Sequence, residues 1–177
     1  MKKVAKVIAI LATLYHVYIG FFGLTRPLAN YAITLSLFMC LTFLYVPFKG
    51  KGKDISIFDA VLSLLSLVVG FYVVANYQTI SVRPTMVGEL TSIEYGLGIL
   101  AILLVLESTR RTIGIPLVYI AVFFLVYCYF GNYLPGMFSY SGFSGCDIVE
   151  SMYLTLDGIY GTPIAGVAML VIQFVLF

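Results

Sequence analysis

The feature that most constrains this chain is the stretch Leu28–Phe48, which contains no charged residue. It is long enough to cross the hydrocarbon core of a bilayer, which takes about 20 helical residues. Its residues do not alternate between polar and apolar, as they would in a strand of a membrane β-barrel. Because lipid offers backbone groups no hydrogen-bonding partner, a run of this kind must satisfy them internally. The stretch therefore predicts a transmembrane helix.

The composition of the whole chain also indicates that lipid surrounds it. Hydrophobic residues make up 62% of the 177 residues and charged residues 10%, whereas soluble domains have about 45–50% and about 25%. A soluble chain of this size could not bury so much apolar surface. We therefore predict an all-α integral membrane protein, a polytopic bundle of about five to six transmembrane helices.

Further apolar runs give the expected positions of the helices. The spans expected in chain order are Val7–Leu24, Leu28–Phe48, Ile57–Tyr77, a fourth that ends at Leu106, and Thr112–Phe130. The uncharged part of the fourth, Tyr95–Leu106, is too short to cross alone. We expect this helix to extend back toward Met86 and to carry Glu89 and Glu94 near the outer interface. A last apolar run covers Ile159–Phe177.

Lysine and arginine predict the orientation of the bundle, because they concentrate in cytoplasmic loops. With the N-terminus in the cytoplasm, the cytoplasmic segments hold Lys2, Lys3, Lys6, Lys49, Lys51, Lys53, Arg110 and Arg111. The outer segments hold only Arg26 and Arg83. This bias requires the first five helices to cross, and it places residues 131–157 outside. A cleavable signal peptide is the alternative for the first run, but bulky Phe21 and Phe22 end it, where small residues would mark cleavage.

Ionisable residues inside predicted spans are candidates for function. His16 lies in the middle of a helix; we expect an interhelical hydrogen bond, with a proton relay as the alternative. Asp59 is expected at a helix start, near Lys53, where a carboxylate favours the helix dipole. Glu89 and Glu94 are expected at the outer interface, with a cation path or a partner protein as alternatives.

The sharpest cluster of charges is Glu107 with Arg110 and Arg111. Spacings of three and four residues place the carboxylate beside both guanidinium groups on one helix face. We interpret the cluster as an anchor that ends the fourth helix at the cytoplasmic face.

The segment that follows the fifth span has weaker patterns. Ser144 and Asp147 have the spacing of a capping box, and Ile148, Met152 and Leu156 fall on one helix face. This predicts a short helix at the membrane interface.

Small residues and a proline then open the last apolar run. Gly158, Gly161, Pro163 and Gly166 could break a helix, as transporters do at binding sites. They could equally be positions of close helix packing.

Motifs for chemistry are missing from the sequence. It contains no nucleophile–base–acid set, metal-ligand spacing or phosphate loop, so we predict no enzyme activity, no metal and no cofactor. It has no basic, aromatic-rich patch for nucleic acid. Cys40 and Cys128 lie in apolar runs, where cysteine acts as a small hydrophobic residue, and Cys146 lies in a polar segment.

An ordered series of short motifs carries a resemblance to a known family. The series is Glu107-Ser-Thr-Arg110-Arg111-Thr-Ile-Gly114, then Tyr133-Leu-Pro135-Gly136, then Met152-Tyr-Leu-Thr-Leu-Asp-Gly158-Ile-Tyr-Gly161-Thr-Pro163. It resembles the fused permease of tripartite ATP-independent periplasmic (TRAP) transporters, in the type paired with TAXI-type binding proteins. In that family a four-helix small-subunit region precedes a large permease region.

The resemblance implies a domain plan. Residues 1–106 would form the four-helix scaffold, 107–130 a linking transmembrane helix, and 131–177 an outer loop, an interfacial helix and the first, truncated helix of the permease region. Pro135, Gly136 and residues 139–157 would shape an outer surface near the binding protein. Because the last apolar run has no polar flank, we expect the chain to be an N-terminal piece of a longer polypeptide.

The resemblance also implies a function. It is secondary active uptake of small organic acids across the inner (plasma) membrane of a bacterium or archaeon, with sodium coupling possible. The partners would be the lipid bilayer, a periplasmic substrate-binding protein and the remainder of the permease chain. Substrate-binding residues would lie beyond residue 177.

Two other classes of function are open. One is a non-transporting membrane scaffold or adaptor subunit, complete at 177 residues. The other is an intramembrane enzyme that uses His16 with Glu89 or Glu94, against which the different expected depths of these residues argue.

Overall fold

A computed structural model describes residues 2–23, 25–48, 56–84, 90–133 and 140–167 of the chain. Within them five helices are long and apolar enough to cross a membrane. They are α1 (Lys2–Phe22), α2 (Pro27–Tyr45), α3 (Ile57–Ala75), α5 (Ser92–Thr112) and α6 (Ile115–Phe130). Shorter helical elements are α4 (Tyr77–Val82), η1 (Gly131–Tyr133), α7 (Gly145–Tyr153) and α8 (Thr162–Gly166). The chain is therefore a polytopic, all-helical membrane protein, as its composition predicted.

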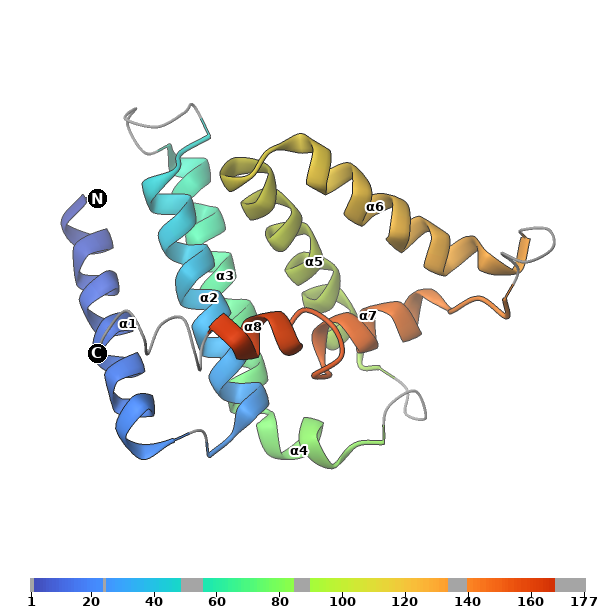
Figure 1. Cartoon of the computed structure of the whole chain (residues 1–177), viewed down its shortest axis with the longest axis horizontal. Coiled ribbons are helices and arrows are strands. Elements are labelled where there is room, and N and C mark those ends of the chain that lie inside the picture. Colours follow the sequence, from blue (N-terminus) through green and yellow to red (C-terminus); the bar gives the residue numbers. More distant parts are fainter. Residues whose placement is uncertain (1, 24, 49–55, 85–89, 134–139, 168–177) are drawn as a thin grey trace.

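The long helices differ in how they are packed (Figure 1). Helices α1, α2, α3 and α5 run side by side, whereas α6 diverges from the others after its start next to α5. Helix α7 returns to pack against α5, and α8 lies against α2. We call the end of the bundle where α1 begins, α2 ends, α3 begins and α5 ends the basic end, because Lys6, Arg110 and Arg111 lie there.

Small residues bring α2 and α3 into close contact. A Cβ atom added at Gly70 of α3 would lie 2.5 Å from the Ser36 side chain of α2, so only glycine fits this crossing. Further along the pair, Cys40 and Ser63 share a hydrogen bond of 2.9 Å. Packing through small residues and hydrogen bonds is how helices associate where the solvent is lipid.

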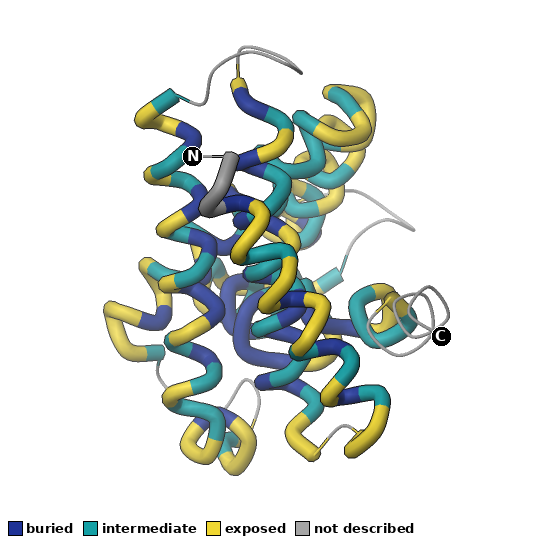
Figure 2. Tube along the Cα trace, turned by 90° about the vertical axis from the view of Figure 1, so that its left-hand side faces the viewer, coloured by how far each residue is buried: buried dark blue, intermediate teal, exposed yellow. Residues whose placement is uncertain are grey.

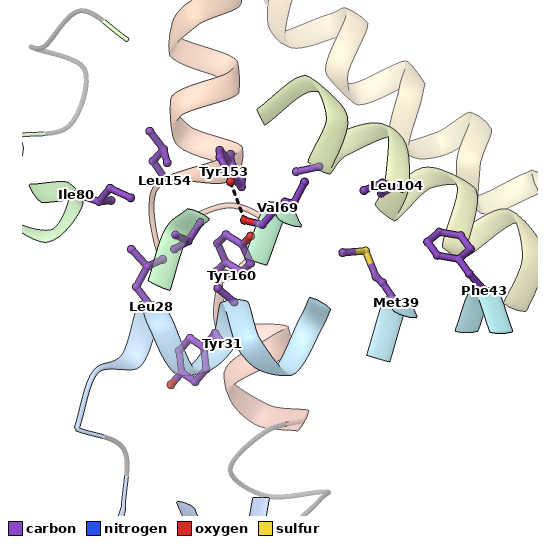
Figure 3. Packing of buried hydrophobic residues seen from close by; sticks show 13 residues of the cluster. Leu28, Tyr31, Met39, Phe43, Val69, Ile80, Leu104, Tyr153, Leu154 and Tyr160 are labelled. Atoms are coloured by element: carbon purple, nitrogen blue, oxygen red, sulfur yellow. Dashed lines mark hydrogen bonds between the residues drawn. The ribbon is translucent and has the colours of Figure 1, made fainter. Parts of the chain in front are cut away.

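The core of the bundle includes side chains from the segment after α6. Tyr153 and Tyr160 are fully buried among residues of α2, α3 and α5, with 0% and 1% of their surfaces exposed (Figure 3). The Tyr153 hydroxyl donates a hydrogen bond of 2.8 Å to the Val69 carbonyl of α3. Outward turns of the long helices are exposed instead (Figure 2), and their apolar side chains are suited to contact with lipid.

Several helix boundaries differ from the sequence prediction; α1 covers Lys2–Phe22 and α2 ends at Tyr45. Helix α5 begins at Ser92, with Thr91 as N-cap and Glu94 as its capping-box partner, so its expected extension toward Met86 is wrong for the two non-helical residues before it. Met86 and Glu89 lie outside the described residues. Helix α3 ends at Ala75 before the separate α4, and α6 begins at Ile115.

The break between α5 and α6 has a local cause. Gly114 has φ +121°, a conformation that side chains disfavour, and Pro116 occupies the first turn of α6, where the missing N–H carries no penalty.

Helix α7 confirms one prediction and changes another. The capping box is present, since the Asp147 amide donates to the Ser144 hydroxyl at 3.2 Å and the Ser144 amide donates to the Asp147 carboxylate at 2.9 Å. The side of α7 that packs against the bundle holds Val149, Glu150 and Tyr153. Leu156, one of the three residues of the predicted apolar face, follows the helix and is exposed.

The neighbouring helix α5 explains which side of α7 is buried. A Cβ atom at Gly98 of α5 would lie 2.3 Å from the Val149 side chain. The absence of a side chain at Gly98 thus lets α7 approach α5 on that side.

Candidate functional site

The charges predicted to cluster at the end of the fourth span form a network of ion pairs at the basic end. Arg110 donates to the Glu107 carboxylate through Nε at 2.7 Å and through Nη2 at 2.8 Å. Arg111 donates to the same carboxylate through Nε at 2.7 Å. Both pairings predicted from the helical spacing are therefore confirmed.

Arg111 also reaches across the bundle. Its Nη1 donates to the Asp59 carboxylate of α3 at 2.6 Å and to the carbonyl of Val46, just after α2, at 3.1 Å. The Arg111 side chain is 3% exposed and that of Asp59 0%. One guanidinium thus joins the ends of α2 and α5 to the start of α3.

Asp59 is held by more than its ion pair. Its carboxylate accepts from the amides of Phe48 at 3.1 Å and Ser56 at 3.0 Å, the second as part of a capping box at the start of α3. The predicted role at a helix start is confirmed. The partner is Arg111, and Lys53 lies outside the described residues.

Aromatic rings surround the remaining face of the network. The Arg111 guanidinium carbon lies 5.0 Å from the ring centre of Phe43, and that of Arg110 lies 5.1 Å from the ring centre of Phe48. Nη2 of Arg111 is buried and has no hydrogen-bond partner among the described residues, and the cation–π contacts of the guanidinium with the Phe43 and Phe48 rings help to stabilise its buried charge. Two carboxylates and two guanidinium groups leave the network neutral.

A second cluster lies at the opposite end of α5. Arg83 donates to the Glu94 carboxylate through two nitrogens, at 3.1 and 3.0 Å, and the Thr91 amide donates to it at 2.9 Å. The Glu94 side chain is 4% exposed and that of Arg83 20%. The hydrogen bonds with Glu94 raise the pKa of Arg83, and the charge of nearby Glu150 acts in the same direction.

His16 makes the interhelical contact expected of it. Its ring nitrogens lie 2.7 Å from the Ala12 carbonyl and 3.2 Å from the Thr34 hydroxyl of α2. Glu94 is bound to Arg83. In the described residues His16 and Glu94 therefore have different partners, and they do not form the pair that an intramembrane enzyme would use.

The other predicted positions within the described part of the chain form turns and the starts of helices. Gly158 turns tightly against the end of α7, where an added Cβ atom would lie 2.3 Å from the Ser151 carbonyl oxygen. Gly161 and Pro163 begin α8 as its N-cap and first turn. Gly114 forms the break before α6. Pro135 and Gly136 lie outside the described residues.

Sequence reasoning missed two contacts of the site. The contact of Arg111 with Asp59 joins residues 52 positions apart, and that of Arg83 with Glu94 joins a loop to a helix start. The available signal was the small number of charges: a buried acidic residue in a membrane protein needs a basic partner.

Comparison of this chain with protein-family models, with curated proteins and with solved structures finds no match.

Proposed function

We propose that this chain is the scaffold-bearing, N-terminal portion of a TRAP-type permease, a secondary active transporter that takes up small organic acids delivered by a periplasmic binding protein. The observation that carries the proposal is the network of Glu107, Arg110, Arg111 and Asp59, which ties α5 to α2 and α3. Glu107, Arg110 and Arg111 belong to the first motif of the series that resembles TRAP permeases. Asp59 is bound by Arg111 of that motif.

The packing of the helices also supports the proposal, because it separates a packed body from one loosely packed helix. Helices α1, α2, α3 and α5 form a body with buried polar contacts, as a static brace requires. Helix α6, which starts at the Gly114 break, has no buried residue. A linking helix between a brace and a moving permease region would have this character, with its contacts supplied by the rest of the transporter.

The proposal has no catalytic step for this chain. The driving force would be an ion gradient, with sodium the candidate ion, and the transporter would lie in the inner membrane of a bacterium or archaeon. The substrate and ion sites would belong to the remainder of the permease.

The test is reconstituted uptake. The gene that contains this reading frame, with all that follows in frame, is expressed, and the protein is placed in liposomes together with the binding protein encoded beside it. Accumulation of radiolabelled mono- and dicarboxylic acids is measured with an inward sodium gradient, with the same sodium concentration on both sides, and without the binding protein. The proposal expects accumulation only when the gradient and the binding protein are both present.

The contrary result identifies the rival function. A stop codon directly after Phe177, no binding-protein gene nearby and no accumulation of any acid would overturn the proposal. Co-purification of the chain with another membrane complex would then assign it as a scaffold or adaptor subunit.

A further inference from the structure

An apolar cleft lies between the two long helices that diverge, α5 and α6. It has a volume of about 280 Å³. The α5 wall includes Ile102 and Leu106, the α6 wall includes Ala121 and Leu125, and Met152 of α7 closes one side. Apart from the Cys128 thiol, the lining side chains are hydrocarbon or aromatic, or the thioether of methionine.

The surroundings of this cleft restrict what can occupy it. Both α5 and α6 are candidate membrane spans, so the cleft between them opens at the depth of the lipid tails. Water has no polar partner there, and a void would forfeit the dispersion contacts of the walls. Lipid tails are as apolar as leucine side chains and are present at high concentration.

A cationic group, Arg110, lies one helical turn beyond this wall, toward the basic end and outside the lining of the cleft. Ile102, Leu106 and Arg110 follow one another at intervals of four, which places them along one side of α5. Two nitrogens of Arg110 bind Glu107, but Nη1 has no hydrogen bond within the described part of the chain. The side chain is 37% exposed, and the Phe48 ring and the Glu107 carboxylate fix its guanidinium group.

We propose that the α5–α6 cleft binds one acyl chain of an anionic glycerophospholipid whose phosphate group is bound by Arg110. Arg110 stands in the last turn of a membrane span, the level of the headgroups, and its free Nη1 is a charge-assisted donor for a phosphate oxygen. Basic residues between transmembrane helices at the cytoplasmic side recognise lipid headgroups in this way. The lipid would fill the space between the body of the bundle and α6, a role separate from transport.

The proposal is tested by native mass spectrometry of the purified chain in detergent, titrated with phosphatidylglycerol or with zwitterionic phosphatidylcholine. Arg110→Gln is expected to weaken phosphatidylglycerol binding about fivefold and to leave phosphatidylcholine binding unchanged. Arg110→Lys keeps the charge and is expected to retain most of the preference. Lys6→Gln, an exposed charge at the same end, is the matched control and is expected to have no effect.

The cleft itself is tested by filling it. Ala121→Phe adds a ring on the lining and is expected to weaken binding of both lipids, whereas Ile120→Phe, at an exposed neighbouring position outside the lining, is expected to leave both unchanged. Circular dichroism of each variant checks that its helix content is retained.

Two results would overturn the proposal. One is phosphatidylglycerol binding that neither Arg110→Gln nor Ala121→Phe alters. The other is a dimer of this chain that Ala121→Phe dissociates while lipid binding stays the same, which would show that a second copy occupies the cleft.

Discussion

The two ends of α5 are both fixed by arginine–carboxylate pairs, but in different ways. At the basic end, Arg111 joins three helices through contacts 52 and 65 positions apart, and its side chain is 3% exposed. At the opposite end, Arg83 binds Glu94 only 11 positions away and is 20% exposed. The first end organises the tertiary structure of the bundle, whereas the second fixes a loop to the first turn of one helix.

This difference has an energetic consequence. Removing one member of a buried pair leaves the other charge desolvated and unpaired, which costs far more than the pair itself contributes. At the opposite end, the arginine that remains after loss of Glu94 is 20% exposed, so water or headgroups can solvate it. The two ends should therefore respond unequally to the loss of one charge.

The largest effect is expected for Arg111→Leu. The change leaves Asp59 buried without its cation and removes a partner of Glu107, so we expect a loss of about 3–5 kcal/mol of unfolding free energy. Reversible unfolding in mixed detergent micelles, followed by circular dichroism, measures it. The double variant Asp59→Asn with Arg111→Leu should recover part of the loss, and a loss below that of Glu94→Gln would contradict the comparison.

A smaller effect is expected for Glu94→Gln at the opposite end. The amide keeps the shape and one acceptor, but it loses the charge-assisted bond to Arg83, for which we expect about 2 kcal/mol. The same unfolding measurement applies. Thr91→Val is the matched control for the cap alone, because the Thr91 amide that binds Glu94 is retained.

The connection that follows the basic end gives a third comparison. Gly114→Ala places a side chain at φ +121°, and we expect it to destabilise the protein by about 1–2 kcal/mol or to shift the angle between α5 and α6. Spin labels on Leu103 of α5 and Tyr119 of α6, which are both exposed, report the angle by electron paramagnetic resonance. Gly96→Ala, an open position on α5, is the control; equal effects of the two changes would contradict a special role for Gly114.

The smallest effect is expected for Arg110→Ala. Arg110 is 37% exposed and shares Glu107 with Arg111, so its loss leaves no buried charge unpaired and should cost less than about 1 kcal/mol. A loss as large as that of Arg111→Leu would show that exposure does not separate the two arginines.

The contacts that sequence predicted are those set by local spacing. The pairing of Glu107 with Arg110 and Arg111 follows from the helical repeat, and the capping box of Ser144 and Asp147 follows from a fixed interval. The five spans follow from the length of their apolar runs. Each of these features depends on residues close together in the chain.

The contacts that sequence did not predict depend on how helices meet. Nothing in the spacing links Asp59 to Arg111, and the side of α7 that is buried depends on the missing side chain of Gly98. The length of the apolar run predicts too early a start for α5, because the capping box of Thr91 and Glu94 begins the helix at Ser92. In a membrane protein the apolar pattern selects helices but does not select which faces touch.

The Lys and Arg residues of the sequence predict that α1, α2, α3, α5 and α6 each cross the bilayer with the basic end in the cytoplasm. The most direct test of this topology is cysteine accessibility in intact cells, after Cys40, Cys128 and Cys146 have been replaced by alanine. Single cysteines at Lys51 and Ile113 should be protected from a membrane-impermeant maleimide, whereas those at Val82, which is exposed, and at Asn132 should react. Labelling of Lys51 and Asn132 from the same side of the membrane would contradict the account.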